Sequence, residues 1–178
     1  MVIATDYTKG YNRALFKHWI DADKDGCDTR AEVLIEEAVT KPKVGSKCLL
    51  TGGKWLSAYD GKSVSKSSDL DVDHMVPLAE AWDSGAQAWD AKKREVYAND
   101  QTDPRHLIAV TGASNRSKSD RDPAEWMPTN KAYTCEYLVN WISIKVRWSL
   151  SVDKKEKDFI TTALKPCKTT KFSVVLVK

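Results

Sequence analysis

Four cysteines constrain the fold of this 178-residue chain more than any other feature: Cys27, Cys48, Cys135 and Cys167. An even number without a CxxC pair argues against a zinc site or a thioredoxin-like motif and favours two disulfides. Cys135 lies near the start of one expected helix and Cys167 just beyond the next, each about sixteen residues from a turn near Ser151. At a rise of ~1.5 Å per residue, two antiparallel helices bring both thiols to one level. Cys135 is therefore expected to pair with Cys167, and Cys27 with Cys48.

Two disulfides indicate an oxidising compartment, and we expect a secreted, extracellular protein. The alternative is a cytosolic protein with buried free thiols. Residues 1–6 lack the charged start and apolar centre of a signal peptide, so the signal peptide is presumed absent from this sequence. No apolar run approaches the ~20 residues that span a bilayer, so no membrane partner is expected. With 42% hydrophobic and 30% charged residues, the chain is expected to form one globular domain over 1–178.

Hydrophobic periodicity predicts an α+β fold in which several helices surround short strands. Tyr133, Tyr137, Trp141, Ile144 and Trp148 recur at steps of three or four, which predicts a helix with one buried face. Together with 153–164 it would form a C-terminal helical hairpin over about 131–165. Other helices are expected over 11–20, 29–39, two pieces of 78–98 broken at 84–85, and 112–122 with Ser114 as cap. Strands are expected over 70–76 and 106–110, with irregular strands over 42–68; the tail, 172–177, is read as an edge strand or as disordered.

Candidate catalytic residues follow the order strand, strand, helix. Hydrolysis of a phosphodiester needs a cation, a base that deprotonates water, and groups that orient the base. Asp73 offers a hard carboxylate ligand, and Asn115 offers a neutral carbonyl oxygen on the following helix. His74 offers an imidazole whose unperturbed pKa of ~6.5 suits a general base. For Asp73 and His74 to reach one phosphate, the strand must bend or end there.

At these residues the chain resembles the HNH, or ββα-metal, nucleases, especially the secreted branch related to the C-terminal domain of type IV restriction enzymes. The resemblance rests on residues 73–77 (DHMVP) and 115–120 (NRSKSD). It implies a ββα core over about 68–122 in which Asp73 and Asn115 hold Mg²⁺ or Mn²⁺ and His74 is the base. The middle position of the family pattern, usually Asn, is His106 here.

Further residues near the motif are expected to support this site. His106 and Asp71 are predicted to orient the catalytic side chains, and Glu80 to reach the cation through water, although an ordinary helix-surface carboxylate explains Glu80 equally well. Arg116 and Lys118 are predicted to grip flanking phosphates, the alternative being solvated cations.

These features predict a metal-dependent endonuclease acting on DNA, and also on RNA, with little sequence preference, since no groove-reading module accompanies the motif. One alternative is a nuclease toxin, which would have an inhibitor protein as partner, or a site-specific endonuclease. Another is a secreted, calcium-braced binding module whose HNH-like residues are inert. No obligate protein partner is evident from the sequence.

A separate motif surrounds the first cysteine, Cys27. Asp21, Asp23, Asp25 and Glu32 match the twelve-residue calcium loop D-x-D-x-D-G-x5-E, with Gly26 at its turn, and the stretch 21–32 resembles an EF-hand loop. Asp28 stands where that family has an apolar residue that pairs two loops, so an isolated, structural Ca²⁺ site is expected. The alternative is an acidic turn that caps the helix after it.

Overall fold

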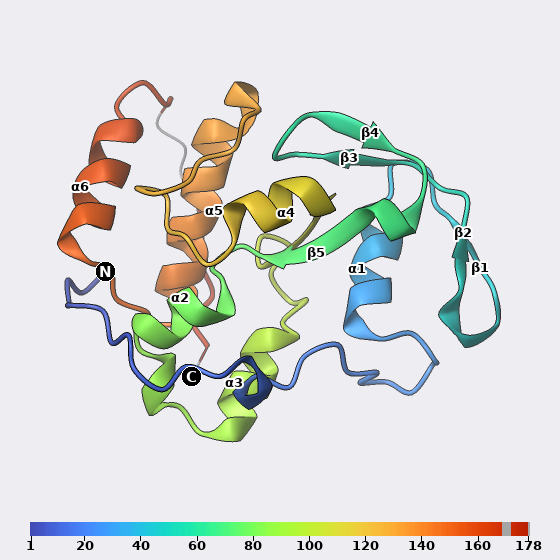
Figure 1. The fold of residues 1–178 in the computed structure, drawn as a ribbon, viewed down its shortest axis with the longest axis horizontal. Coiled ribbons are helices and arrows are strands. Elements are labelled where there is room, and N and C mark those ends of the chain that lie inside the picture. The colour runs from blue at the N-terminus through green and yellow to red at the C-terminus, as the bar shows by residue number, and fades with distance from the viewer. Residues whose placement is uncertain (169–171, 178) are drawn as a thin grey trace.

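The structure, a computed structural model, describes residues 1–168 and 172–177 and combines helices with small antiparallel sheets (Figure 1). The helices are α1 (Thr29–Glu36), α2 (Leu78–Asp83), α3 (Ala91–Ala98), α4 (Gly112–Lys118), α5 (Thr134–Arg147) and α6 (Lys154–Ala163). The strands are β1 (Lys43–Val44), β2 (Leu50–Thr51), β3 (Trp55–Ser57), β4 (Lys62–Val64), β5 (Leu70–His74) and β6 (Leu107–Thr111). The expected α+β class is confirmed.

The antiparallel pair β5 and β6 crosses the middle of the molecule (Figure 1). Its register places Leu70 opposite Thr111 and His74 opposite Leu107. The long excursion between the two strands forms α2 and α3, and β6 runs directly into α4. The predicted order of strand, strand and helix is therefore present.

Hydrophobic side chains cover both faces of this hairpin, which fixes its position firmly. On one face, Val72 and Ala109 pack with Leu34 of α1 and Trp55 of β3. On the other, Val110 belongs to a large aromatic core built mainly from α2, α3 and α5. Because both faces are buried, side chains at the end of β5 are held on a rigid base.

Helices α5 and α6 lie side by side and antiparallel (Figure 1). The aromatic stripe from Tyr133 to Trp148 is buried, as predicted, with each of its five residues at most 7% exposed. Both predicted disulfides are present: Cys135–Cys167, with 5.7 Å between Cα atoms, and Cys27–Cys48, with 5.0 Å.

The helix predicted over 11–20 is wrong. A short 3-10 turn, Arg13–Leu15, is its only helical part, and other backbone groups of the segment bond to the side chains of Arg94 on α3 and of Asn99, the residue that follows α3. The side-chain amide of Asn99 donates to the Lys17 carbonyl and accepts from the Ile20 amide. Trp19 adopts a left-handed backbone with φ 58°, which no α-helix contains.

Two smaller expectations are also corrected. Thr111, not Ser114, caps α4, because its side-chain oxygen accepts a hydrogen bond from the Ser114 amide. Residues 172–177 form no strand, although the Val177 amide donates to the Arg147 carbonyl. Among the described residues, no helix is both long and apolar enough to cross a bilayer.

Candidate active site

His74 is the last residue of β5 and is almost fully buried. Its Nε2 atom lies 2.9 Å from the Ala98 carbonyl at the end of α3. Because a carbonyl only accepts hydrogen bonds, Nε2 carries the ring hydrogen and Nδ1 keeps its lone pair. Nδ1 is hydrogen bonded to none of the described residues. Burial lowers the pKa of His74 well below its usual value, with His106 contributing in the same direction, so the imidazole is neutral. It is therefore in the state that a general base requires.

Trp19 covers one face of the His74 imidazole. The two rings stack with 5.4 Å between centroids and 26° between planes. Tyr97 lies nearly parallel to the same imidazole, at 6.3 Å. With the bond to Ala98, these contacts hold the ring in one orientation.

Asp73 precedes His74 and is also buried. Its Oδ2 atom accepts hydrogen bonds from the Tyr59 hydroxyl and from the Lys118 ammonium, both at 2.6 Å. Burial raises the pKa of the Asp73 carboxyl, and the adjacent Lys118 opposes that rise. Two donors therefore fix Oδ2, while Oδ1 takes no hydrogen bond from the described residues and is free to bind a ligand.

Asn115 lies on α4 and is oriented by Asp71. Its side-chain Nδ2 donates to Asp71 Oδ2 at 3.1 Å, which leaves the amide oxygen for another partner. Asp71 stands two residues before Asp73, so both side chains leave β5 on the same face. The orienting role of Asp71 stays a prediction, and this hydrogen bond is the contact through which it would act.

Asp73, His74 and Asn115 line one cavity of about 280 Å³ at the end of β5. Consecutive residues reach it together because the strand ends at His74. The cavity wall also contains Arg13, Val72, Pro77, Leu78, Arg116, Ser119 and Asp120. A carboxylate, an amide and a neutral imidazole side chain therefore line a single space. Carboxylate and amide oxygens are hard donors that suit Mg²⁺ or Mn²⁺.

Lys118 differs from its predicted role as a phosphate-binding residue. Its side chain is fully buried, pairs with Asp73 and also donates to the His74 carbonyl at 2.9 Å. The ammonium group is thus occupied inside the protein, behind the carboxylate that faces the cavity. Arg116, by contrast, lines the cavity, and its contact with a phosphate stays a prediction.

Glu80 is also placed elsewhere than predicted. It lies on α2, is buried, and bonds to the ammonium group of Lys145, which lies 3.3 Å from Glu156. Burial raises the pKa of Glu80 to about 8. Because Glu80 faces this internal cluster and does not line the cavity, it is neither a surface carboxylate nor a water-mediated metal ligand.

His106 is buried beside His74 but is not hydrogen bonded to it. The two rings are perpendicular, with 6.0 Å between centroids, and His106 Nε2 lies 2.7 Å from the Tyr97 carbonyl. The Tyr97 carbonyl thus holds His106, and the Ala98 carbonyl holds His74. Both rings also pack against the Tyr97 ring, so His106 supports His74 through packing. Its Nδ1 atom is buried without a partner among the described residues.

The sequence reading missed Tyr59, Trp19 and Arg13 at this site. Tyr59 stands in a Gly-, Ser- and Lys-rich stretch with no motif, and its contact with Asp73 comes from the tertiary fold. Arg13 and Trp19 were assigned to a helix. The only available signal was their place in an aromatic-rich segment outside the motif.

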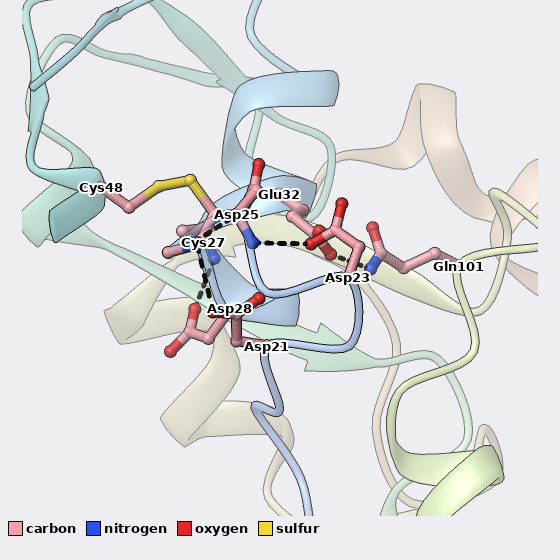
Figure 2. Close-up of a disulfide and its surroundings, with 10 residues drawn as sticks. Asp21, Asp23, Asp25, Cys27, Asp28, Glu32, Cys48 and Gln101 are labelled. Carbon is pink, nitrogen blue, oxygen red and sulfur yellow. Dashed lines mark hydrogen bonds between the residues drawn. A yellow bond between two sulfur atoms is a disulfide. The ribbon is translucent and has the colours of Figure 1, made fainter.

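The acidic loop lies next to the Cys27–Cys48 disulfide (Figure 2), and none of its aspartates lines the cavity. Carboxylate oxygens of Asp21, Asp23 and Asp25 lie within 4.8 Å of one another, and all three side chains are exposed. Glu32 accepts a hydrogen bond from Gln101 and is outside this group (Figure 2). Asp28 caps α1 by accepting from the Ala31 amide at 2.8 Å. The structure gathers three of the four predicted calcium ligands, and Ca²⁺ binding stays a prediction.

The cavity is lined by a buried neutral imidazole, a carboxylate, an amide and the side chains of Arg13 and Arg116. Such a set of side chains is typical of metal-dependent hydrolases. The chain belongs to the family of C-terminal domains of GmrSD restriction endonucleases, whose family model matches residues 28–163. The family is one of nuclease domains, and the match spans α1 to α6 but not the segment with Arg13 and Trp19.

The chain is similar to an uncharacterized secreted protein of Arthroderma benhamiae, with 42% identity over 158 residues. The alignment covers 89% of this chain and 76% of that protein. No solved structure matches the chain.

Proposed function

We propose that this protein is a secreted, metal-dependent HNH endonuclease that hydrolyses phosphodiester bonds of DNA, and also of RNA, with little sequence preference. The observation that carries the proposal is the convergence of Asp73, His74 and Asn115 on one cavity at the end of β5. Membership of a restriction endonuclease family supports the reaction class. Two disulfides, and a fungal relative that is named a secreted protein, support an extracellular location.

The residues present fit a hard divalent cation, because Asp73 and Asn115 both line the cavity and the hydrogen bonds of the described residues leave Asp73 Oδ1 and the Asn115 amide oxygen unused. When bound, Mg²⁺ or Mn²⁺ would neutralise charge on the phosphate and on the leaving oxygen. In this reading β5, β6 and α4 are the ββα-metal core. Tyr59 and Lys118 keep Asp73 ionised and in place, and Asp71 keeps the Asn115 oxygen turned outward.

His74 would act as the base. Its Nδ1 lone pair takes a proton from water, the water oxygen bonds to phosphorus, and the phosphorus–oxygen bond of the leaving sugar breaks. The Nε2–H bond to Ala98 keeps the ring in the tautomer that this step needs. The stack against Trp19 limits its rotation.

Incubation of supercoiled plasmid with the protein and Mg²⁺, with and without EDTA, tests this function. We expect EDTA-sensitive nicking, and a smear of fragments from linear DNA instead of discrete bands. His74→Ala should abolish cleavage with a thermal melt close to the parent, whereas His18→Ala, a histidine outside the cavity, should remain active. No EDTA-sensitive cleavage of DNA or RNA with Mg²⁺ or Mn²⁺ would leave an inert binding module as the better description.

Asp71→Ala gives a second test of the same site. Without the Asp71 contact the Asn115 amide is free to turn, and loss of such an outer contact weakens metal sites by about 10–100-fold. The Mg²⁺ concentration that gives half-maximal nicking should therefore rise, with little change in the rate at saturating Mg²⁺. An unchanged Mg²⁺ requirement would contradict the orienting role of Asp71.

A further inference from the structure

The segment before the matched family region contributes Arg13 to the lining of the catalytic cavity. Residues 11–20 are tied to the body of the protein from several sides. The side chain of Arg94 on α3 donates to the Leu15 carbonyl at 3.2 Å, and Asn99 donates to the Lys17 carbonyl at 2.8 Å. Phe16 is fully buried and packs edge-on against Trp82 and Tyr97. These contacts hold the segment at a fixed place beside His74.

Arg13 is the cation that this segment brings to the cavity. It lies in the 3-10 turn Arg13–Leu15, where the Asn12 side chain caps the turn by accepting from the Ala14 amide at 2.9 Å. Arg13 lines the same cavity as His74, Asn115 and Arg116. Across the described residues Arg13 enters no ion pair, and its side chain is accessible to solvent.

The charges around the cavity leave room for an anion. Lys118 and Asp73 form a buried ion pair, so their charges cancel and they add no net charge to the cavity. The other charged residues of the wall are Arg13, Arg116 and Asp120. Two positive charges against one negative charge leave an excess of one positive charge before any metal binds. A guanidinium group also matches the geometry of two phosphate oxygens, which an ammonium group does not.

We propose that Arg13 binds a backbone phosphate of the nucleic acid at the catalytic cavity, so that a segment outside the matched family region completes the substrate site. This inference rests on the proposed endonuclease function. Arg13 would approach the phosphate from the side of residues 11–20, and Arg116 from α4. The two arginines would then hold the backbone so that its phosphorus faces His74 Nδ1.

The test compares Arg13→Gln and Arg13→Lys with Lys17→Gln. Lys17 is the matched control because it lies in the same segment, is exposed, and pairs with Glu95 at 3.3 Å instead of lining the cavity. Steady-state cleavage of a short DNA duplex with Mg²⁺ gives kcat/KM for each protein. Affinity is measured by fluorescence anisotropy with the same duplex, with each substitution placed in the non-cleaving His74→Ala background, across a series of salt concentrations.

Arg13→Gln should weaken duplex binding and lower kcat/KM by about 10–100-fold, the range expected for one charge-assisted contact. The slope of log Kd against log salt should fall by about one. Arg13→Lys should keep the salt slope of the parent but only part of the affinity, because the charge remains and the forked geometry is lost. Lys17→Gln should match the parent in both measurements.

The two levels of the proposal fail differently. If the parent cleaves the duplex but Arg13→Gln equals Lys17→Gln in kcat/KM, affinity and salt slope, the role of Arg13 is overturned and the endonuclease stands. If the parent neither binds nor cleaves nucleic acid, the proposed function fails and the role of Arg13 fails with it. Thermal melting of each variant shows whether a loss reflects unfolding, and Arg13→Lys then separates charge and geometry in a folded protein.

Discussion

The ammonium group of Lys118 lies 2.6 Å from Asp73 Oδ2, and neither side chain is more than 8% exposed. This ion pair stands at the junction of β5 and α4, directly behind the candidate catalytic cavity. In this position the ammonium group favours the ionised form of Asp73 and opposes the rise in its pKa that burial causes. It also leaves only Oδ1 of Asp73 to face the cavity, which defines one direction from which a cation can bind.

Lys118→Met should destabilise the protein strongly, because it leaves the Asp73 carboxylate buried with Tyr59 as its only donor. Breaking one half of a buried pair typically removes about 3–5 kcal/mol from the free energy of unfolding. Urea denaturation followed by tryptophan fluorescence measures the change. Lys62→Met is the control, since Lys62 is exposed and its pair with Asp60, at 3.6 Å, should contribute at most about 1 kcal/mol.

Replacing both partners separates lost charge balance from lost packing. An Asp73→Leu/Lys118→Met double variant removes the unpaired charge and should recover part of the stability while remaining inactive. If Lys118→Met is as stable as Lys62→Met, the buried pair does not hold the junction together.

The core of the candidate site could be predicted because its determinants are local. Asp73 and His74 are adjacent at a strand end, and Asn115 sits in a helix that begins directly after the paired strand. Likewise the Cys135–Cys167 bridge follows from the lengths of two helices around one turn. Spacing around one turn fixes which thiols meet, and the motif places Asp73 and His74 together, whereas Asp73 and Asn115 come to one cavity only because β5 pairs with β6.

Burial of charged residues could not be predicted in the same way. Lys118 and Glu80 have the residue types of surface positions, yet each is buried against a partner that is at least 45 residues away in sequence. The segment 11–20 shows the opposite error: its apolar spacing suits a helix, but Phe16 enters the core while Leu15 stays 38% exposed. Its backbone bonds to α3, which no pattern within the segment indicates.

His106 should make the fold sensitive to acid. Burial lowers the pKa of His106 to about 4, whereas an unfolded histidine titrates near ~6.5. The unfolded chain therefore takes up a proton first as the pH falls. The stability that His106 contributes is complete above about pH 6.5 and is lost as the pH drops toward about 4, by up to about 1.4 kcal/mol per pH unit.

Urea denaturation between pH 4 and 8 checks this expectation. His106→Gln should lower stability at neutral pH, because the site is fully buried, but should show a shallower loss of stability toward acid than the parent. Burial raises the pKa of Glu37 to about 7 and that of Glu80 to about 8, so these two groups add stability as the pH falls. Their contribution is the same in the parent and in the variant and cancels when the slopes are compared. Equal slopes for His106→Gln and the parent would contradict the assignment.

The acidic loop should bind Ca²⁺ and brace the region of the Cys27–Cys48 disulfide. Three carboxylates within 4.8 Å repel one another, and a divalent cation relieves that repulsion. For an isolated loop with a Kd of about 0.1 mM, 10 mM Ca²⁺ would add about 2.7 kcal/mol, which raises the melting temperature of a chain this size by several degrees.

An Asp23→Asn/Asp25→Asn variant should lose the rise. Asp158→Asn/Glu125→Gln, which removes two exposed carboxylates elsewhere, should keep it. If Ca²⁺ shifts both variants equally, the ion acts through general screening and the loop is an acidic cap of α1.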